Sequence, residues 1–260
     1  MARRSDESKK KYEIQTLEQG DIYIFYRPRV EVEQTEGLSD VQRFYMVLSS
    51  NSFYRLLVIG RKKMPDPEPQ GHRKSWGFVE MVADNADTIR DELSGSEYGT
   101  KTRGQRFQPG ARPAGEGVYR LLRHGDHTHL VYSLDLPQEP GEVQEELQIE
   151  EEASYIISVK NPEQGGPQAL GLSEDTKVDY PQDLRDVFDG RKFASADPPD
   201  LLNYDGAEFI LIPAAGDIDE ELGIELDADR ESLDSDELFK DLRMGKRNRS
   251  IEPLTRGEWK

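Results

Sequence analysis

Three of the four histidines of this 260-residue chain lie close together, at His124, His127 and His129. Neutral imidazoles bind transition metals, and alternate residues of a β-strand point to the same side of a sheet. Residues 128–136 have the composition of a strand, so His127 and His129 are expected on one face. Asp126, His124 or a carboxylate from another strand would complete the site. The spacing predicts a divalent-metal site; the alternative is a polar hairpin corner whose histidines are simply hydrated.

A second group of residues that could bind a ligand lies in the basic, glycine-rich stretch 95–116. Its positive side chains are those of Lys101, Arg103, Arg106 and Arg112. Guanidinium groups pair with phosphate or carboxylate oxygens, and glycines let backbone N–H groups approach an anion. Neither G-x-x-x-x-G-K-[ST] nor G-x-G-x-x-G occurs in the stretch. We predict a ligand-binding loop for a protein or a small anionic molecule; the alternative is a hydrated loop whose arginines pair with nearby carboxylates.

Two short resemblances accompany the histidines. Residues 121–126 read LLRHGD, which resembles the Arg-His-Gly signature of histidine phosphatases, and residues 127–129 resemble the first metal motif of cupins. The phosphatase resemblance implies a second essential histidine far downstream, and the cupin resemblance implies a histidine in a second motif. No histidine follows His129. Both resemblances end after a few residues, and no family is assigned from them.

Other catalytic chemistry finds little support in the sequence. The chain has no cysteine, which excludes disulfides, thiolate zinc sites and a cysteine nucleophile. No G-x-S-x-G motif is present. A pair of carboxylates cannot be singled out among 52 acidic residues. No cofactor is predicted apart from the divalent metal that the histidines would hold.

Charge is distributed unevenly along a chain whose net charge is −18. Residues 217–241 contain 12 acids and two bases, whereas residues 242–260 contain six bases and two acids. Such a charged segment with spaced leucines is typical of tails that order on a protein partner, or that fold back over the chain's own basic region. We expect a disordered stretch at 1–12 and a largely flexible tail at 216–260. The acidic charge disfavours binding to nucleic acid.

The remaining residues predict mostly β-structure. Strands are expected at 21–26, 43–48, 53–59, 76–82, 118–122, 128–136, 153–159 and 207–212, with short helices near 84–95, 142–147 and 181–190. The short connections favour antiparallel pairing. The fold class is therefore α+β and strand-dominated, with a few short helices. Residues 13–215 are expected to form one composite domain, with a subdomain break at 137–152 as the alternative.

Two functions fit these features. The first is a non-catalytic binding or adaptor protein that engages a protein partner through the basic loop and the tail at 217–260. The alternative is a metal-dependent enzyme acting on a phosphorylated small molecule, with His127 and His129 on the ion and the arginines on the anion. No apolar run is long enough to cross a membrane or to serve as a signal peptide, so a cytoplasmic location is predicted.

Overall fold

The structure is a computed structural model. It describes residues 13–50, 53–66, 74–102, 104–165, 178–215, 222, 226, 242 and 250–260. The predicted disordered stretch 1–12 and most of the predicted flexible tail lie outside these residues. Within the described part of the chain, no helix has the length and apolar character that crossing a membrane requires.

Strands dominate the fold, as the sequence predicts. The strands are β1 (Ile14–Pro28), β2 (Val41–Ser49), β3 (Tyr54–Ile59), β4 (Ser75–Ala83), β5 (Ser96–Thr100), β6 (Gly104–Gln108), β7 (Arg112–His124), β8 (His127–Leu136), β9 (Glu152–Lys160), β10 (Phe193–Ser195) and β11 (Glu208–Ala215). The α-helices are α1 (Ala86–Leu93), α2 (Glu142–Leu147), α3 (Gln182–Asp186) and α6 (Glu252–Arg256). Two 3-10 helices are η1 (Leu38–Asp40) and η4 (Pro199–Leu202).

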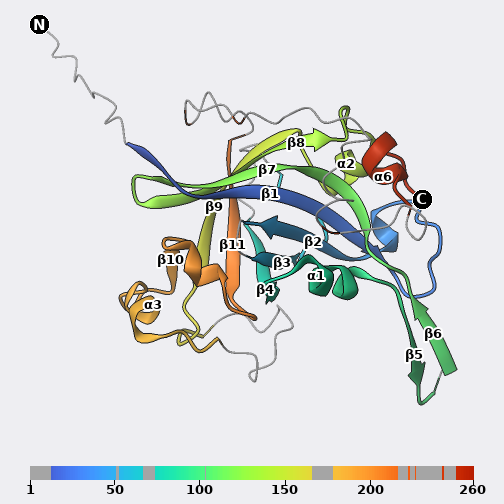
Figure 1. The fold of residues 1–260 in the computed structure, drawn as a ribbon, viewed down its shortest axis with the longest axis horizontal. Coiled ribbons are helices and arrows are strands. Elements are labelled where there is room, and N and C mark those ends of the chain that lie inside the picture. Colours follow the sequence, from blue (N-terminus) through green and yellow to red (C-terminus); the bar gives the residue numbers. More distant parts are fainter. Residues whose placement is uncertain are drawn as a thin grey trace, which may run out of the picture.

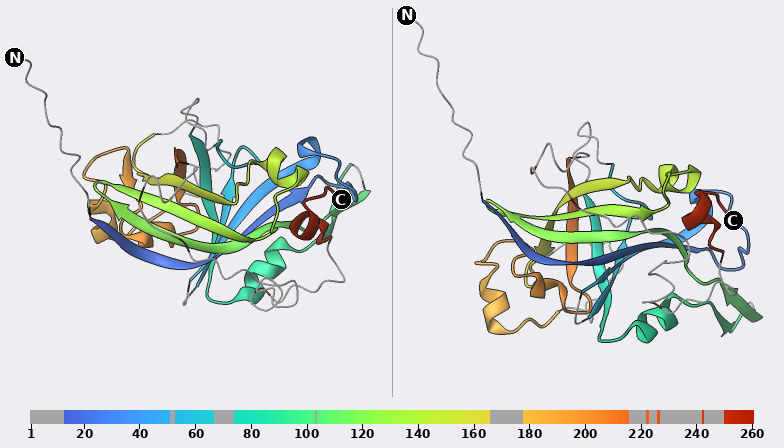
Figure 2. Two further views of the ribbon diagram at one scale, coloured as in Figure 1. Left: turned by 90° about the horizontal axis from the view of Figure 1, so that it is seen from above. Right: turned by 45° about the horizontal axis from the view of Figure 1, so that its top comes forward.

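The main sheet closes on itself. Its nine strands follow the order β10-β9-β11-β4-β3-β2-β1-β7-β8, and a further pairing joins β9 to β8. One edge of β9 is shared, because residues 152–156 pair with β8 and residues 158–160 pair with β10. The long strands β1, β7 and β8 lie side by side and form one curved wall, and β4 and β11 run across it in the view of Figure 1 (Figures 1 and 2). All pairings are antiparallel, as predicted.

Side chains at alternate positions of the strands point to opposite faces of the sheet, and they form two separate apolar layers. In β1, Ile22, Ile24 and Tyr26 face the interior of the closed sheet, whereas Tyr23 and Phe25 face outward. The outward layer is covered by α1, by Leu242 and by Leu254. Burial on both faces explains why these strands are nearly continuous apolar runs in the sequence.

Two sequence expectations about local structure are wrong. The stretch 95–116, expected to be a loop, forms a hairpin of β5 and β6 and then the first part of β7. The stretch lacks the alternating apolar pattern of a half-buried strand, because a hairpin that projects from the body has no apolar face to bury. Asp84 and Asp87 are residue types that cap helices and are the caps expected from sequence, but the cap of α1 is Asn85, which accepts a hydrogen bond from Thr88 N. The sequence also suggests an ordered segment with a narrow apolar stripe at 233–244 in the tail, and this segment lies outside the described residues except for Leu242.

The described parts of the tail lie against the body. Leu222 and Leu226 are buried beside Leu122 and Val131 on the outer face of β7 and β8. Residues 250–260, which include α6, pack at the end of the sheet near α2 (Figure 1). These residues therefore belong to the folded body.

Candidate functional site

The three clustered histidines lie at one end of the β7–β8 hairpin. His124 pairs with His127, and Leu122 pairs with His129, so all three histidines belong to the outer face of the sheet. The His124 and His129 rings are 5.7 Å apart between centroids. His127 Nε2 lies 3.4 Å from Asp126 Oδ1. The described residues nevertheless contain no group of three or more histidine, aspartate or glutamate side chains that could hold a metal ion.

Burial distinguishes His129 from its neighbours. The ring is 2 % exposed, and its Nδ1 lies 3.1 Å from Ser154 Oγ on β9. Burial, with smaller effects from His124 and His127, lowers the pKa of His129 to about 4. The ring is therefore neutral at physiological pH and contributes to the packing between β8 and β9.

The basic residues predicted to bind a ligand do not form one cluster. Lys101 is exposed at the turn of the β5–β6 hairpin, and Arg103 lies outside the described residues. Arg106 on β6 pairs with both carboxylate oxygens of Glu31, at 3.1 and 2.5 Å. Arg112 is 7 % exposed and donates to Thr35 Oγ1 at 2.9 Å and to Glu33 O. Arg112 is thus part of the interior and Arg106 is half-buried, so Lys101 is the exposed one among the described residues of this set.

The hairpin projects from the body on a narrow neck (Figure 1). At the neck, Gly95 and Gly110 face each other, and a Cβ atom on Gly95 would lie 3.0 Å from Gly110 N. Buried Arg27 holds this neck by donating to Ser94 O at 3.0 Å and to Pro109 O at 3.2 Å. The same guanidinium donates to Glu92 O at the end of α1, at 2.6 Å. The hairpin is therefore a rigidly mounted element.

Two aromatic rings stand exposed on this hairpin. Tyr98 on β5 and Phe107 on β6 are each 40 % exposed, and they are the large hydrophobic residues that the described part of the chain leaves exposed. Tyr98 pairs with Arg106 and Phe107 pairs with Glu97, so the two rings stand on opposite faces of the ribbon. A cavity of about 370 Å³ lies at the neck, lined by Arg43, Ser94, Ser96 and Gln108 among others.

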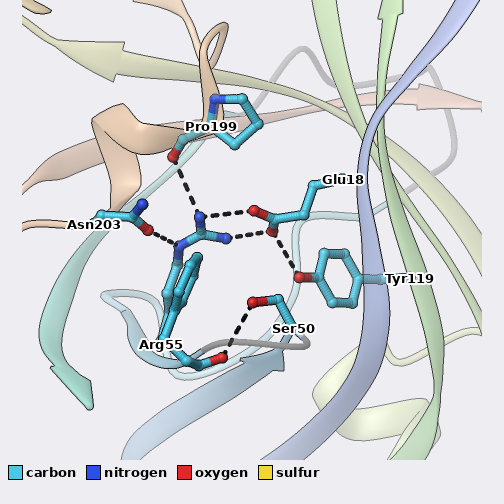
Figure 3. A network of polar contacts seen from close by, with 7 residues as sticks. Glu18, Ser50, Arg55, Tyr119, Pro199 and Asn203 are labelled. Atoms are coloured by element: carbon cyan, nitrogen blue, oxygen red, sulfur yellow. Dashed lines mark hydrogen bonds and ion pairs between the residues drawn. The ribbon is translucent and has the colours of Figure 1, made fainter. Parts of the chain in front are cut away.

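A buried ion pair ties the opposite part of the sheet together (Figure 3). Arg55 on β3 is 0 % exposed and donates to both carboxylate oxygens of Glu18 on β1, at 2.5 and 2.9 Å. Tyr119 on β7 donates to the same carboxylate at 2.7 Å. The Arg55 Nε group donates to Asn203 Oδ1 at 2.7 Å, and Pro199 O accepts a longer bond. The network connects three strands to the segment that carries η4.

No known protein-family model, curated protein or solved structure matches this chain. Sequence reasoning found the hairpin's basic residues and the aromatic Phe107 among them, but missed the exposed Tyr98. It also missed Arg27 and Arg55, whose surroundings come from segments far apart in the chain. The sequence did contain an indication that Arg55 has a buried partner, because an arginine inside a run of apolar strand residues needs one.

Proposed function

We propose that this protein is a non-catalytic binding protein whose β5–β6 hairpin contacts a protein partner. The observation that carries the proposal is the exposure of Tyr98 and Phe107 on one projecting ribbon. Aromatic residues dominate the energetics of protein interfaces, and large exposed apolar side chains commonly mark them.

The partner that fits this hairpin is an extended, acidic protein segment. Lys101, Arg103 and Arg106 outnumber the single acid Glu97 within residues 96–108, and the balance stays positive when Glu31, the partner of Arg106, is included. Within the described residues β5 pairs with β6 alone, so its outer edge can accept a further strand. A segment added along β5 would lead toward the neck cavity, which Arg43, Ser94 and Ser96 line among others.

The tail is a weaker candidate for partner contact than the sequence suggested. Leu222, Leu226, Leu242 and residues 250–260 all lie on the body. A partner that bound the tail through these leucines would have to displace them. The tail's part in binding stays a prediction, and the predicted cytoplasmic location is kept as part of this proposal.

The test compares the full chain with a Tyr98→Ser/Phe107→Ser variant. Both proteins are used to capture partners from native lysate, and each captured protein is then purified and titrated against both. We expect a partner bound by the full chain and bound at least tenfold more weakly by the variant. A Tyr54→Ser variant, altered at a half-buried position on the body, is the control. Equal affinities for the hairpin variant and the full chain would overturn the proposal.

The metal-dependent alternative has the shared face of the three histidines in its favour, but the positions of the arginines oppose it. The arginines and the histidines would have to share one site, yet Arg112 begins β7 and His124 ends it. At about 3.3 Å per residue along a strand, these ends are roughly 40 Å apart. Metal analysis of the purified protein, with His127→Ala as the control, tests this prediction directly.

A further inference from the structure

Residues 250–260 bind to the body in the way that a peptide binds to a receptor. Three of their backbone carbonyl oxygens accept hydrogen bonds from it. Pro253 O accepts from Gln144 Nε2 at 2.9 Å, Gly257 O accepts from Val143 N at 2.9 Å, and Lys260 O accepts from Thr35 Oγ1. The bond to Val143 supplies an acceptor for one of the N–H groups that every helix start leaves without a partner inside the helix.

The donors that contact residues 250–260 belong to Thr35, Val143 and Gln144, and together they form a binding surface that we call the seat. The body itself positions these donors. Gln144 is 0 % exposed; its Nε2 also donates to Ala114 O at 2.7 Å, and its Oε1 accepts from Gly141 N at 3.0 Å. Thr35 is held by Arg112, which donates to Thr35 Oγ1 at 2.9 Å. The donors of the seat are therefore already oriented, and pre-organised donors lower the cost of binding.

Shape and apolar contacts make the seat selective. The Trp259 ring lies edge-on to Tyr26, with centroids 5.1 Å apart, and Leu254 is fully buried. Gly257 has φ +64°, and a Cβ atom on it would lie 2.5 Å from Gly141 Cα. A ligand of this seat must therefore carry a glycine at that position, an apolar residue three places before it and an aromatic residue two places after it.

The bound segment also orders itself. The Glu252 carboxylate accepts from Ser250 Oγ at 2.6 Å and from Lys260 Nζ at 2.5 Å, and Thr255 Oγ1 donates to Ile251 O at 3.1 Å. These contacts join residues within the segment and do not depend on the rest of the chain. We expect a short peptide with this sequence to form the same turn once it occupies the seat.

We propose that this seat is a peptide-binding site able to take residues 250–260 from a second copy of the chain. Every contact described above is available in trans, so an exchange between two copies replaces each contact with an identical one. Residues 243–249 join the segment to Leu242 and span at most roughly 25–30 Å when extended, enough to reach an adjacent copy. Attachment keeps the segment at an effective concentration in the millimolar range, so the chain's own segment occupies the seat unless it is weakened.

The experiment uses two full-length variants that break the same contact from opposite sides. Gly257→Val disables the segment and leaves the seat intact, whereas Gly141→Val blocks the seat and leaves the segment intact. The probe is a fluorescein-labelled peptide of residues 250–260, amidated at its end and followed by fluorescence anisotropy. We expect binding to the Gly257→Val protein, at least tenfold weaker binding to the unaltered chain, and none to Gly141→Val.

A mixture of the two variants tests the exchange itself. One intact seat and one intact segment are present, so the mixture should form a heterodimer in sedimentation velocity that neither variant forms alone. Peptides carrying Gly257→Val or Trp259→Ala should not bind the Gly257→Val protein, which keeps the test decisive even if Gly141→Val fails to fold. Equal binding of altered and unaltered peptides, or no binding of either, would overturn the proposal. Neither outcome depends on the hairpin, so the proposed function is tested separately.

Discussion

Arg55 and Glu18 form a two-point ion pair in the interior, with N–O distances of 2.5 and 2.9 Å. Glu18→Gln should lower the free energy of unfolding by about 3–5 kcal/mol, because it leaves the buried guanidinium without a counter-charge. Tyr119→Phe removes one hydrogen bond to the carboxylate and should cost about 1.5–3 kcal/mol. Urea unfolding measures both changes. Equal costs for the two variants would show that the charge pairing is not the dominant contribution.

Arg112 supports the fold, in contrast to the binding role predicted for it. Replacing Arg112 by Met removes the bonds to Thr35 Oγ1 and Glu33 O, at about 1.5–3 kcal/mol for each bond lost from a charged group. Lys101→Met, at the exposed turn of the hairpin, should leave the free energy of unfolding within about 0.5 kcal/mol of the unaltered chain. Thermal and urea unfolding check the pair. If the Arg112→Met variant is as stable as the unaltered chain, Arg112 becomes a candidate for ligand binding again.

His129 should make stability depend on pH. Its pKa is lowered to about 4 in the folded chain, against about 6.5 when unfolded, so the unfolded state binds the proton more readily. The stabilisation is complete above pH 6.5 and is lost as the pH falls from 6.5 to 4, by about 3 kcal/mol in total. His129→Gln should lack this loss, whereas His127→Gln should keep it. An NMR titration that places the His129 pKa near 6.5 would contradict the prediction.

Substitution by alanine should have different effects on stability at two glycines that lie on different strands. A Cβ atom on Gly117 in β7 would lie 2.1 Å from Ser133 O, so Gly117→Ala must displace β8 and should cost about 1–3 kcal/mol or more. A Cβ atom on Gly99 in the hairpin meets nothing within 4 Å, so Gly99→Ala should be neutral or slightly stabilising. The midpoint of urea unfolding distinguishes the two. Similar urea midpoints for the Gly117→Ala and Gly99→Ala variants would mean that β8 can move aside without loss of stability.

The fold could be predicted wherever strands are buried and local. The runs around Ile24, Val47 and Leu57 are apolar on both faces, and short loops join their neighbours, so strand identity and antiparallel pairing followed from sequence. Closure of the sheet could not be predicted, because it depends on pairing between β8 and β9 and on β11 entering between β9 and β4. Such pairings bring together strands that are distant in the chain, and composition does not encode which of them meet.

The candidate sites were predicted less well than the fold. The sequence located the basic stretch, though not its hairpin, and gave equal weight to Arg106 and Arg112, whose exposure differs because one lies on the hairpin and the other inside. Sequence alternation placed His127 and His129 on one face, yet it carried no information on burial by β9. The apolar residues Leu254 and Trp259 stood in a charged tail, where their distance from other apolar residues hid their place in the core.

The pairing of β1 with β7 also has a consequence for synthesis on the ribosome. Tyr26 pairs with Arg112, and Ile14 with His124, so one edge of β1 has no partner until β7 has been made. At about 5–20 residues per second, the 85 residues between the paired positions Tyr26 and Arg112 take about 4–17 s to translate. During that interval a nascent chain presents an apolar strand edge. We expect its yield to depend on chaperones that shield such edges and on the speed at which β7 leaves the exit tunnel.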